Sequence, residues 1–178
     1  MVGTSVDAES PAGSVRRPMT LVIRPAEPGE FAAVGDLCVA AYQPFLAHAG
    51  KYVEVLRDAA SRAAAAELLV AVDEQLLGTI TFVPEGGPLG EIAAPDETEF
   101  RMLAVSPAAQ GRGVGSALLQ HIVDETAARG RTGIVCSSQP AMRAAHRIYE
   151  RLGFTRDPQR DWSPLPGVEL LAFALKLG

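Results

Sequence analysis

The sequence predicts one α/β domain built on a mixed sheet, with a parallel β-α-β unit at its centre. Short apolar runs that read as strands alternate with stretches whose apolar residues recur at helical spacing. From Glu99 to Ser138 the pattern is strand, glycine-rich turn, helix and strand, which is typical of two parallel strands joined by a right-handed crossover. With 178 residues, 48% of them hydrophobic, the chain is long enough to bury a sizeable core.

The N-terminal half is predicted to form one strand, two helices and a hairpin, followed by a loop. Phe31, Val34 and Leu37 lie on one face of the first predicted helix. Two apolar runs that flank residues 73–75 indicate the hairpin. The predicted elements are a strand at 20–26, helices at 28–46 and 51–66, strands at 67–73 and 76–84, and a Gly- and Pro-rich loop at 85–96.

The C-terminal half is predicted to alternate strands with helices. Pro140 marks a helix start, and Gly130 and Gly153 mark helix ends. The predicted elements are strands at 98–106, 132–138 and 167–177, helices at 115–129 and 141–152, and an irregular segment at 154–164. The complete predicted order is β-α-α-β-β-β-α-β-α-β, and a ligand is expected beyond the carboxyl ends of the parallel strands.

Composition narrows the function classes. The formal net charge of −5 argues against nucleic acid as a partner and is compatible with a cationic substrate. No apolar run reaches about 18 residues, so no membrane partner is expected. Cys38 and Cys136 show neither metal-ligand spacing nor a disulfide framework, so we expect no metal and a cytoplasmic location. Residues 1–18 lack the apolar segment of a signal peptide and are expected to be a disordered tail before a single domain at 19–178.

Three glycines interrupt residues 105–119, VSPAAQGRGVGSALL, although glycine in a helix costs about 1 kcal/mol relative to alanine. Gly111, Gly113 and Gly115 precede a predicted helix, whose first backbone N–H groups have no intrahelical partner. Without β-carbons in the way, a phosphate can approach these groups directly. Close packing of the strand against the helix is the alternative reading. The dinucleotide fingerprint lacks its third glycine, and no Lys-Ser or Lys-Thr follows as in a P-loop.

Residues 99–119, EFRMLAVSPAAQGRGVGSALL, resemble the central motif of the GNAT superfamily of acyl-CoA N-acyltransferases. The pattern Q-x-x-G-x-G, which begins at Gln110, follows a strand that ends in Val105. A second segment at 146–154, HRIYERLGF, is similar to another motif of the family, and the order of elements over 20–177 also matches. The resemblance implies a GNAT-type, mostly antiparallel sheet around the central parallel unit.

The resemblance implies an acetyl-CoA-dependent N-acetyltransferase, in which a primary amine attacks the thioester directly in a ternary complex. The pantetheine arm would pair like an extra strand with the backbone of Leu103, Ala104 and Val105, where the two parallel strands splay apart. The pyrophosphate would lie on the turn that follows. The turn residues are Gln110, Gly111, Arg112, Gly113, Val114, Gly115 and Ser116.

The resemblance also implies two catalytic residues. Glu99 is the predicted base that takes a proton from the amine, directly or through water, and Glu97 is the reserve. Tyr149 is the predicted acid for the CoA sulfur, because a phenol with a pKa near about 10 is neutral and can donate. The structural alternatives are that Glu99 pairs with Arg101 and that Tyr149 only packs.

The acceptor is predicted to be a small-molecule amine or a peptide. In this family it is selected by the segment between the first two helices, here Tyr42–Phe45, and by the loop before the last strand, here 157–166 with Trp162. These aromatic side chains could equally be core or homodimer contacts. The carboxylates at 91, 96 and 97 could attract a cationic amine or be plain solvated surface.

Several other residues receive an interpretation. Met142 stands where the family often has an asparagine that contacts pantetheine, so either Ser137 or Ser138 takes over that contact or the contact is absent. Cys136 is interpreted as a buried structural thiol. The histidines at 48, 121 and 146 show neither triad nor metal spacing and are interpreted as surface or interface residues. Two rival functions stay open: a non-catalytic acyl-CoA-binding sensor on the same fold, and a nucleotide-binding module that uses the glycine turn.

Overall fold

The computed structural model describes residues 19–46 and 50–178, so the tail predicted at 1–18 and His48 lie outside the described residues. The strands are β1 (Val22–Pro25), β2 (Glu67–Asp73), β3 (Gln75–Val83), β4 (Glu97–Val105), β5 (Gly133–Ser138), β6 (Thr155–Arg156), β7 (Trp162–Leu165) and β8 (Val168–Lys176). The helices are α1 (Phe31–Tyr42), α2 (Tyr52–Arg57), α3 (Ala59–Ala65), α4 (Val114–Ala128) and α5 (Arg143–Arg151). Short 3-10 turns are η1 (Pro28–Glu30), η2 (Gln43–Phe45), η3 (Pro107–Ala109) and η4 (Pro158–Arg160).

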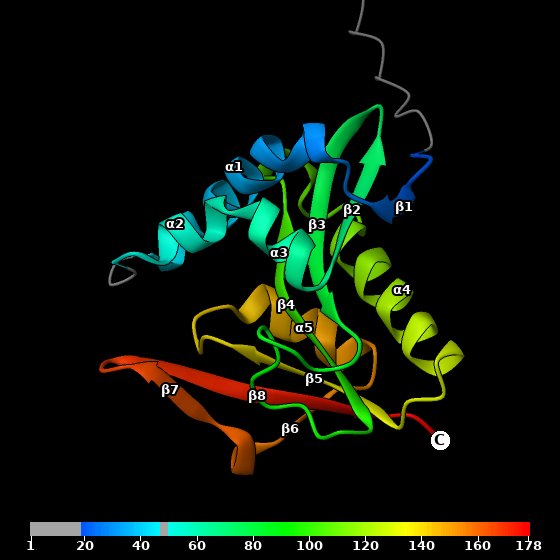
Figure 1. The fold of residues 1–178 in the computed structure, drawn as a ribbon, viewed down its shortest axis with the longest axis vertical. Helices are drawn as coiled ribbons and strands as arrows, with labels where there is room; N and C mark the ends of the chain where they lie inside the picture. The colour runs from blue at the N-terminus through cyan, green and yellow to red at the C-terminus, as the bar shows by residue number, and fades with distance from the viewer. Residues whose placement is uncertain (1–18, 47–49) are drawn as a thin grey trace, which may run out of the picture.

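The strands form one mixed sheet in the order β1-β2-β3-β4-β5-β8-β6, and β7 pairs with β8 (Figure 1). Among the described strands only β4 and β5 run parallel, and α4 is the crossover that joins them. This topology confirms the predicted fold class. Among the described helices none is both long and apolar enough to span a membrane.

Helices cover both faces of the sheet. Helices α1, α2 and α3 lie together on one side, and α4 runs along the other (Figure 1). Each layer buries its own core: Leu118 and Ile122 of α4 pack with Phe82 and Phe100 of the sheet, whereas Val34 of α1 belongs to the core on the opposite face. The apolar residues that predicted the helices are therefore the ones that hold them to the sheet.

Two segments differ from the sequence-based expectation. The helix predicted at 51–66 is divided into α2 and α3 at Asp58, whose side chain accepts a hydrogen bond from the Ser61 N–H at 3.0 Å and so caps α3. The segment expected to be irregular at 154–164 contains β6, η4 and β7. Strands of two and four residues are too short to show an alternating pattern, which is why they were not recognised.

The central parallel strands separate shortly after they begin. Their pairing covers three residue pairs and ends at Glu99 and Val135, although β4 continues to Val105 and β5 to Ser138. The backbones therefore diverge toward their carboxyl ends, where the sequence predicts the ligand.

A β-bulge in β4 accompanies this separation. Thr79 of β3 pairs with Ala104 and Thr81 pairs with Arg101, so β4 carries one extra residue between these pairs. Met102, at the bulge, has a φ of 52°, which is unusual for a residue other than glycine. A bulge bends its strand and increases the local twist, and here it lies in the part of β4 that still pairs with β3 but no longer pairs with β5.

Candidate active site

Two cavities meet near the separated ends of β4 and β5. The first, which we call the glycine cavity, has a volume of about 640 Å³ and is lined by the end of β4, the glycine turn and α5. The second, which we call the tryptophan cavity, has a volume of about 530 Å³ and is lined by parts of α2, β4, β7 and β8. Tyr42, Phe45 and Met142 line both cavities, so the two cavities share a wall at these side chains.

The glycine cavity brings together nine of the ten residues predicted to bind the cofactor. Arg112 is the exception, because its exposed guanidinium points to the Met19 sulfur at 3.4 Å. The nine that line the cavity are Leu103, Ala104, Val105, Gln110, Gly111, Gly113, Val114, Gly115 and Ser116.

The three glycines of the turn serve two purposes. Gly111 and Gly113 have φ values of 74° and 84°, which disfavour any side chain, and a β-carbon at either would meet nothing within 4 Å. Gly115 is different, because a β-carbon there would lie 3.1 Å from Ile148 Cδ1 of α5. Gly111 and Gly113 therefore leave the turn uncovered at the cavity, which the phosphate reading requires, whereas Gly115 allows α4 to pack closely on α5 rather than on the strand.

The first turn of α4 faces this cavity with free donors. Gly113 is the N-cap, and no described side chain caps the helix. The backbone N–H groups that follow it lack intrahelical acceptors and carry the positive end of the helix dipole. Arg147 and Arg151 of α5 also line the cavity. Sequence reasoning missed these two cations, although their spacing of four residues places them on one helix face.

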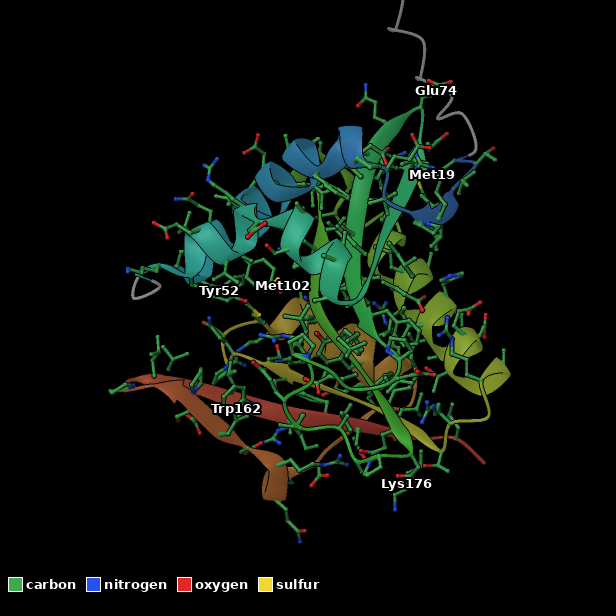
Figure 2. All side chains as sticks on the ribbon, viewed as in Figure 1. Met19, Tyr52, Glu74, Met102, Trp162 and Lys176 are labelled. Carbon is green, nitrogen blue, oxygen red and sulfur yellow. The ribbon has the colours of Figure 1, made fainter. Side chains whose placement is uncertain are left out.

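The tryptophan cavity is mostly aromatic and aliphatic. Tyr52, Met102 and Trp162 line it from α2, β4 and β7 (Figure 2). The Trp162 indole N–H donates to Ser137 Oγ at 3.0 Å, which holds the indole against the end of β5. The aromatic residues suggested for acceptor selection are thus cavity walls in this structure.

Glu91 is a carboxylate on the wall of the tryptophan cavity, and it forms an ion pair with Arg101 at 3.0 Å. Burial raises the pKa of Glu91, while the Arg101 charge opposes this shift. Of the three loop carboxylates considered for attracting an amine, Asp96 bonds Thr132 and Glu97 pairs with Arg160, so neither lines this cavity.

Glu99 is fully enclosed and lines neither cavity. Its Oε2 accepts three backbone N–H bonds, from Glu91 at 2.8 Å, Ile92 at 3.1 Å and Ala93 at 3.2 Å. Its Oε1 is buried and has no hydrogen-bond partner among the described residues. The carboxylate therefore anchors the loop that places Glu91 at the cavity wall.

Tyr149 is also buried and lines neither cavity. Its ring packs edge-on against Phe100 and Phe173, with centroid distances of 5.7 Å and 5.3 Å. Burial raises the pKa of Tyr149 well above its usual value, and its hydroxyl interacts with the side chains of Ser138 and Cys136. Burial raises the pKa of the Cys136 thiol in the same way, which favours the structural reading of that cysteine.

Sequence reasoning missed a pair of side chains beside Tyr149. His146 Nε2 lies 3.1 Å from the hydroxyl oxygen of Ser138, and Ser138 lines the tryptophan cavity. The imidazole is half-buried and packs on the Phe173 ring with a centroid distance of 4.7 Å. No motif signals this pair, because Ser138 ends a strand and His146 lies on the next helix.

A family model matches most of the domain. Residues 31–154 match the family model described as the acetyltransferase (GNAT) family. The chain belongs to the GNAT acetyltransferase family. This confirms the resemblance drawn from the glycine turn and from the segment at 146–154. No three His, Cys, Asp or Glu side chains lie close enough to hold a metal ion within residues 19–46 and 50–178.

Curated relatives of this GNAT acetyltransferase match over part of their length. The [ribosomal protein bS18]-alanine N-acetyltransferase of Escherichia coli K12 is 39% identical over 59 residues, which are 33% of this chain and 40% of that protein. The N-acetylaspartate synthetase of Danio rerio is 30% identical over 91 residues, which are 48% of this chain and 32% of that protein. The matched segments thus span less than half of each relative.

Solved structures share the fold over most of the chain. An acetyltransferase of the GNAT family from Brucella melitensis, in complex with acetyl-CoA, is 25% identical with a TM-score of 0.58, and the match covers 90% of this chain and 93% of that one. The E. coli ribosomal-protein-S18-alanine N-acetyltransferase is 20% identical with a TM-score of 0.64, over 89% and 95% of the two chains. A chain of the NatC complex bound to Gag peptide and CoA is 18% identical with a TM-score of 0.61, over 90% and 100%.

Proposed function

We propose that this GNAT acetyltransferase transfers the acetyl group of acetyl-CoA to a primary amine by direct attack in a ternary complex. The observation that carries the proposal is the pair of cavities that meet at Tyr42, Phe45 and Met142. One cavity presents uncapped backbone donors and arginines, which suit a diphosphate, and the other presents aromatic walls, which suit an acceptor.

Acetyl-CoA suits the glycine cavity in two ways. Its diphosphate would lie on the backbone donors of residues 110–116, with Arg147 and Arg151 as cations on the cavity wall. Arg112 stays in the proposal as a cation of the turn that would have to rotate from Met19 toward the diphosphate. Its pantetheine arm would enter between β4 and β5, where Leu103, Ala104 and Val105 continue beyond the last parallel pair. Crystal structures of similar proteins with acetyl-CoA or CoA support this choice of donor.

The acceptor is a small-molecule amine or a peptide that occupies the tryptophan cavity. The names of the relatives offer two kinds of primary amine, the alanine of a ribosomal protein and the amino acid of N-acetylaspartate. Glu91 is the carboxylate that would meet an ammonium group at the cavity wall.

The predicted catalytic roles of Glu99 and Tyr149 stay part of the proposal, as groups that act through an intervening atom. Neither side chain lines a cavity, so Glu99 would need a water and Tyr149 would need a path past Ser138. The raised pKa of Tyr149 leaves its hydroxyl protonated at neutral pH, which a proton donor to the departing sulfur requires.

Thiol release from acetyl-CoA tests the proposal with a panel of amines: a peptide with N-terminal alanine, aspartate, spermidine and tyramine. Turnover with at least one amine supports an enzyme. Acetyl-CoA binding with no turnover across a wider panel would favour the acyl-CoA sensor. Thermal shifts with acetyl-CoA, CoA, ATP and NAD address the nucleotide-binding rival, which predicts equal stabilisation by ATP and NAD. Glu99→Gln and Tyr149→Phe should each lower the rate by about tenfold or more if the predicted roles hold.

A further inference from the structure

Ser138 lies beside Met142, one of the side chains that the two cavities share. Its hydroxyl oxygen is 3.6 Å from the Met142 sulfur, and Met142 lines both cavities. Ser138 itself ends β5, beyond the last parallel pair with β4, and it lines the tryptophan cavity. An amine held in that cavity and directed at a thioester from the glycine cavity would pass this hydroxyl.

His146 stands behind Ser138 as a proton acceptor. Its Nε2 is 3.1 Å from the serine oxygen, and the ring also interacts with the Gln139 backbone. When the other ring nitrogen donates its hydrogen to the Gln139 backbone, Nε2 carries no hydrogen and is free to accept the serine proton. Because the imidazole is half-buried rather than enclosed, it also has access to solvent.

We propose that Ser138 and His146 form the path by which the acceptor amine loses its first proton. The inference rests on the proposed acetyl transfer. As the ammonium gives a proton to Ser138 Oγ, the serine proton moves to His146 Nε2, and the imidazolium then releases it to solvent. The freed electron pair of the amine forms the C–N bond. The C–S bond breaks with its electron pair on sulfur. Glu99 takes the second proton of the nitrogen through a water and passes it to solvent, while Tyr149 protonates the sulfur and regains its proton from solvent.

The surroundings of His146 suit this role. Burial lowers the pKa of His146, so the imidazole is neutral at pH 7 and able to accept a proton. Arg143 and Arg156 also lower this pKa, whereas Glu150 and the Gln139 backbone raise it. Among the other neighbours, Tyr149, Cys136 and Phe173 carry no charge at neutral pH, because the pKa values of the tyrosine and the cysteine are raised by burial. Among these neighbours the imidazole is therefore the group available to accept a proton from Ser138.

The experiment is a pH profile of kcat/KM for His146→Gln and Ser138→Ala, with the amine of the panel that releases thiol fastest. At pH 7 each variant should lose about tenfold to a hundredfold. The loss should shrink as the pH rises through the pKa of the amine, which is about 7.7–8.0 for a peptide N-terminus and about 10.4 for a lysine-type amine, because the free base then needs no proton acceptor. His121→Gln on α4 is the control and should keep the wild-type profile, since His121 lines neither cavity.

An equal loss at every pH would overturn the relay, because a purely structural role lowers the rate without regard to proton supply. No loss at pH 7 would overturn it as well. Calorimetry with acetyl-CoA separates this failure from failure of the proposed function: unchanged binding with an unchanged pH profile rejects only the relay, whereas no binding by the wild type rejects both. Ser138→Thr retains a hydroxyl and should restore part of the rate lost in Ser138→Ala.

Discussion

Replacing Glu99 with alanine should destabilise the fold strongly. The change removes the carboxylate that accepts three backbone N–H bonds from Glu91, Ile92 and Ala93, at 2.8 Å, 3.1 Å and 3.2 Å. A hydrogen bond to a charged group contributes about 1.5–3 kcal/mol, and a buried unsatisfied N–H costs about 1–3 kcal/mol. Because the loop is partly exposed and water can reach some of the freed groups, we expect a total loss of about 3–5 kcal/mol.

Differential scanning calorimetry measures this loss. For a domain of this size about 1 kcal/mol shifts Tm by about 2–4 °C, so Glu99→Ala should melt about 10 °C lower than the wild type. Glu99→Gln keeps an oxygen acceptor and should lose about 1–2 kcal/mol. The control is Glu85→Ala, because the Glu85 side chain is 76% exposed and its pairing with Arg131 at 3.4 Å should contribute under about 0.5 kcal/mol.

Kinetics on the same variants distinguish two roles of Glu99: holding the 85–96 loop in place, and acting as the catalytic base. If Glu99 acts by holding Glu91 at the wall of the tryptophan cavity, Glu99→Gln raises the KM for the amine and leaves the shape of the pH profile intact. If it is a base, kcat falls and the acid limb of the profile changes. A Glu99→Ala variant that melts within 2 °C of the wild type would refute the anchoring argument, whatever the kinetics.

Three further predictions address other parts of the structure. Gly113→Ala should weaken CoA binding by about tenfold in calorimetry, because it strains a residue with a φ of 84° in the turn that lines the glycine cavity. Gly86→Ala, with a similar φ of 74° on a distant loop, should not weaken it. Trp162→Phe removes the indole donor to the end of β5, so the KM for the amine should rise severalfold while the KM for acetyl-CoA stays constant. The hydrogen bond from Arg24 lowers the pKa of Glu30 to about 2. A carboxyl whose pKa is lower in the folded state stabilises the fold above its unfolded pKa of about 4.5, and this stabilisation is lost as the pH falls toward about 2. In urea titrations across that window the wild type should lose about 1 kcal/mol of unfolding free energy more than Glu30→Gln, and an equal pH dependence of the two proteins would contradict the assignment.

The glycine turn and the β-α-β unit could be predicted because their signals are local. Neighbouring residues in the sequence determine three features: the strand that ends in Val105, the positive φ at Gly113 and the helix that follows. The aromatic walls at Tyr42, Phe45 and Trp162 were suggested through the family resemblance, and the structure places all three on the tryptophan cavity.

The contacts that were not predicted depend on packing between distant segments. The partners of Glu99 depend on the path of the 85–96 loop, which carries no periodic pattern. The bulge at Met102 lies in an apolar run without the glycine or asparagine that usually marks a positive φ. The contact between Ser138 and His146 depends on how α5 packs near β8, where the imidazole contacts the Phe173 ring. The spacing of these residues in the sequence does not determine that packing.

The short parallel seam between β4 and β5 also bears on the cooperativity of the whole domain. Three residue pairs form the backbone connection between the half of the sheet that runs from β1 to β4 and the half that contains β5, β8 and β6. A ligand that hydrogen-bonds the free edges of both strands would add a second connection between the two halves of the sheet. Amide hydrogen exchange in β4 and β5 should therefore slow together when CoA is added, far beyond the few amides that the ligand touches.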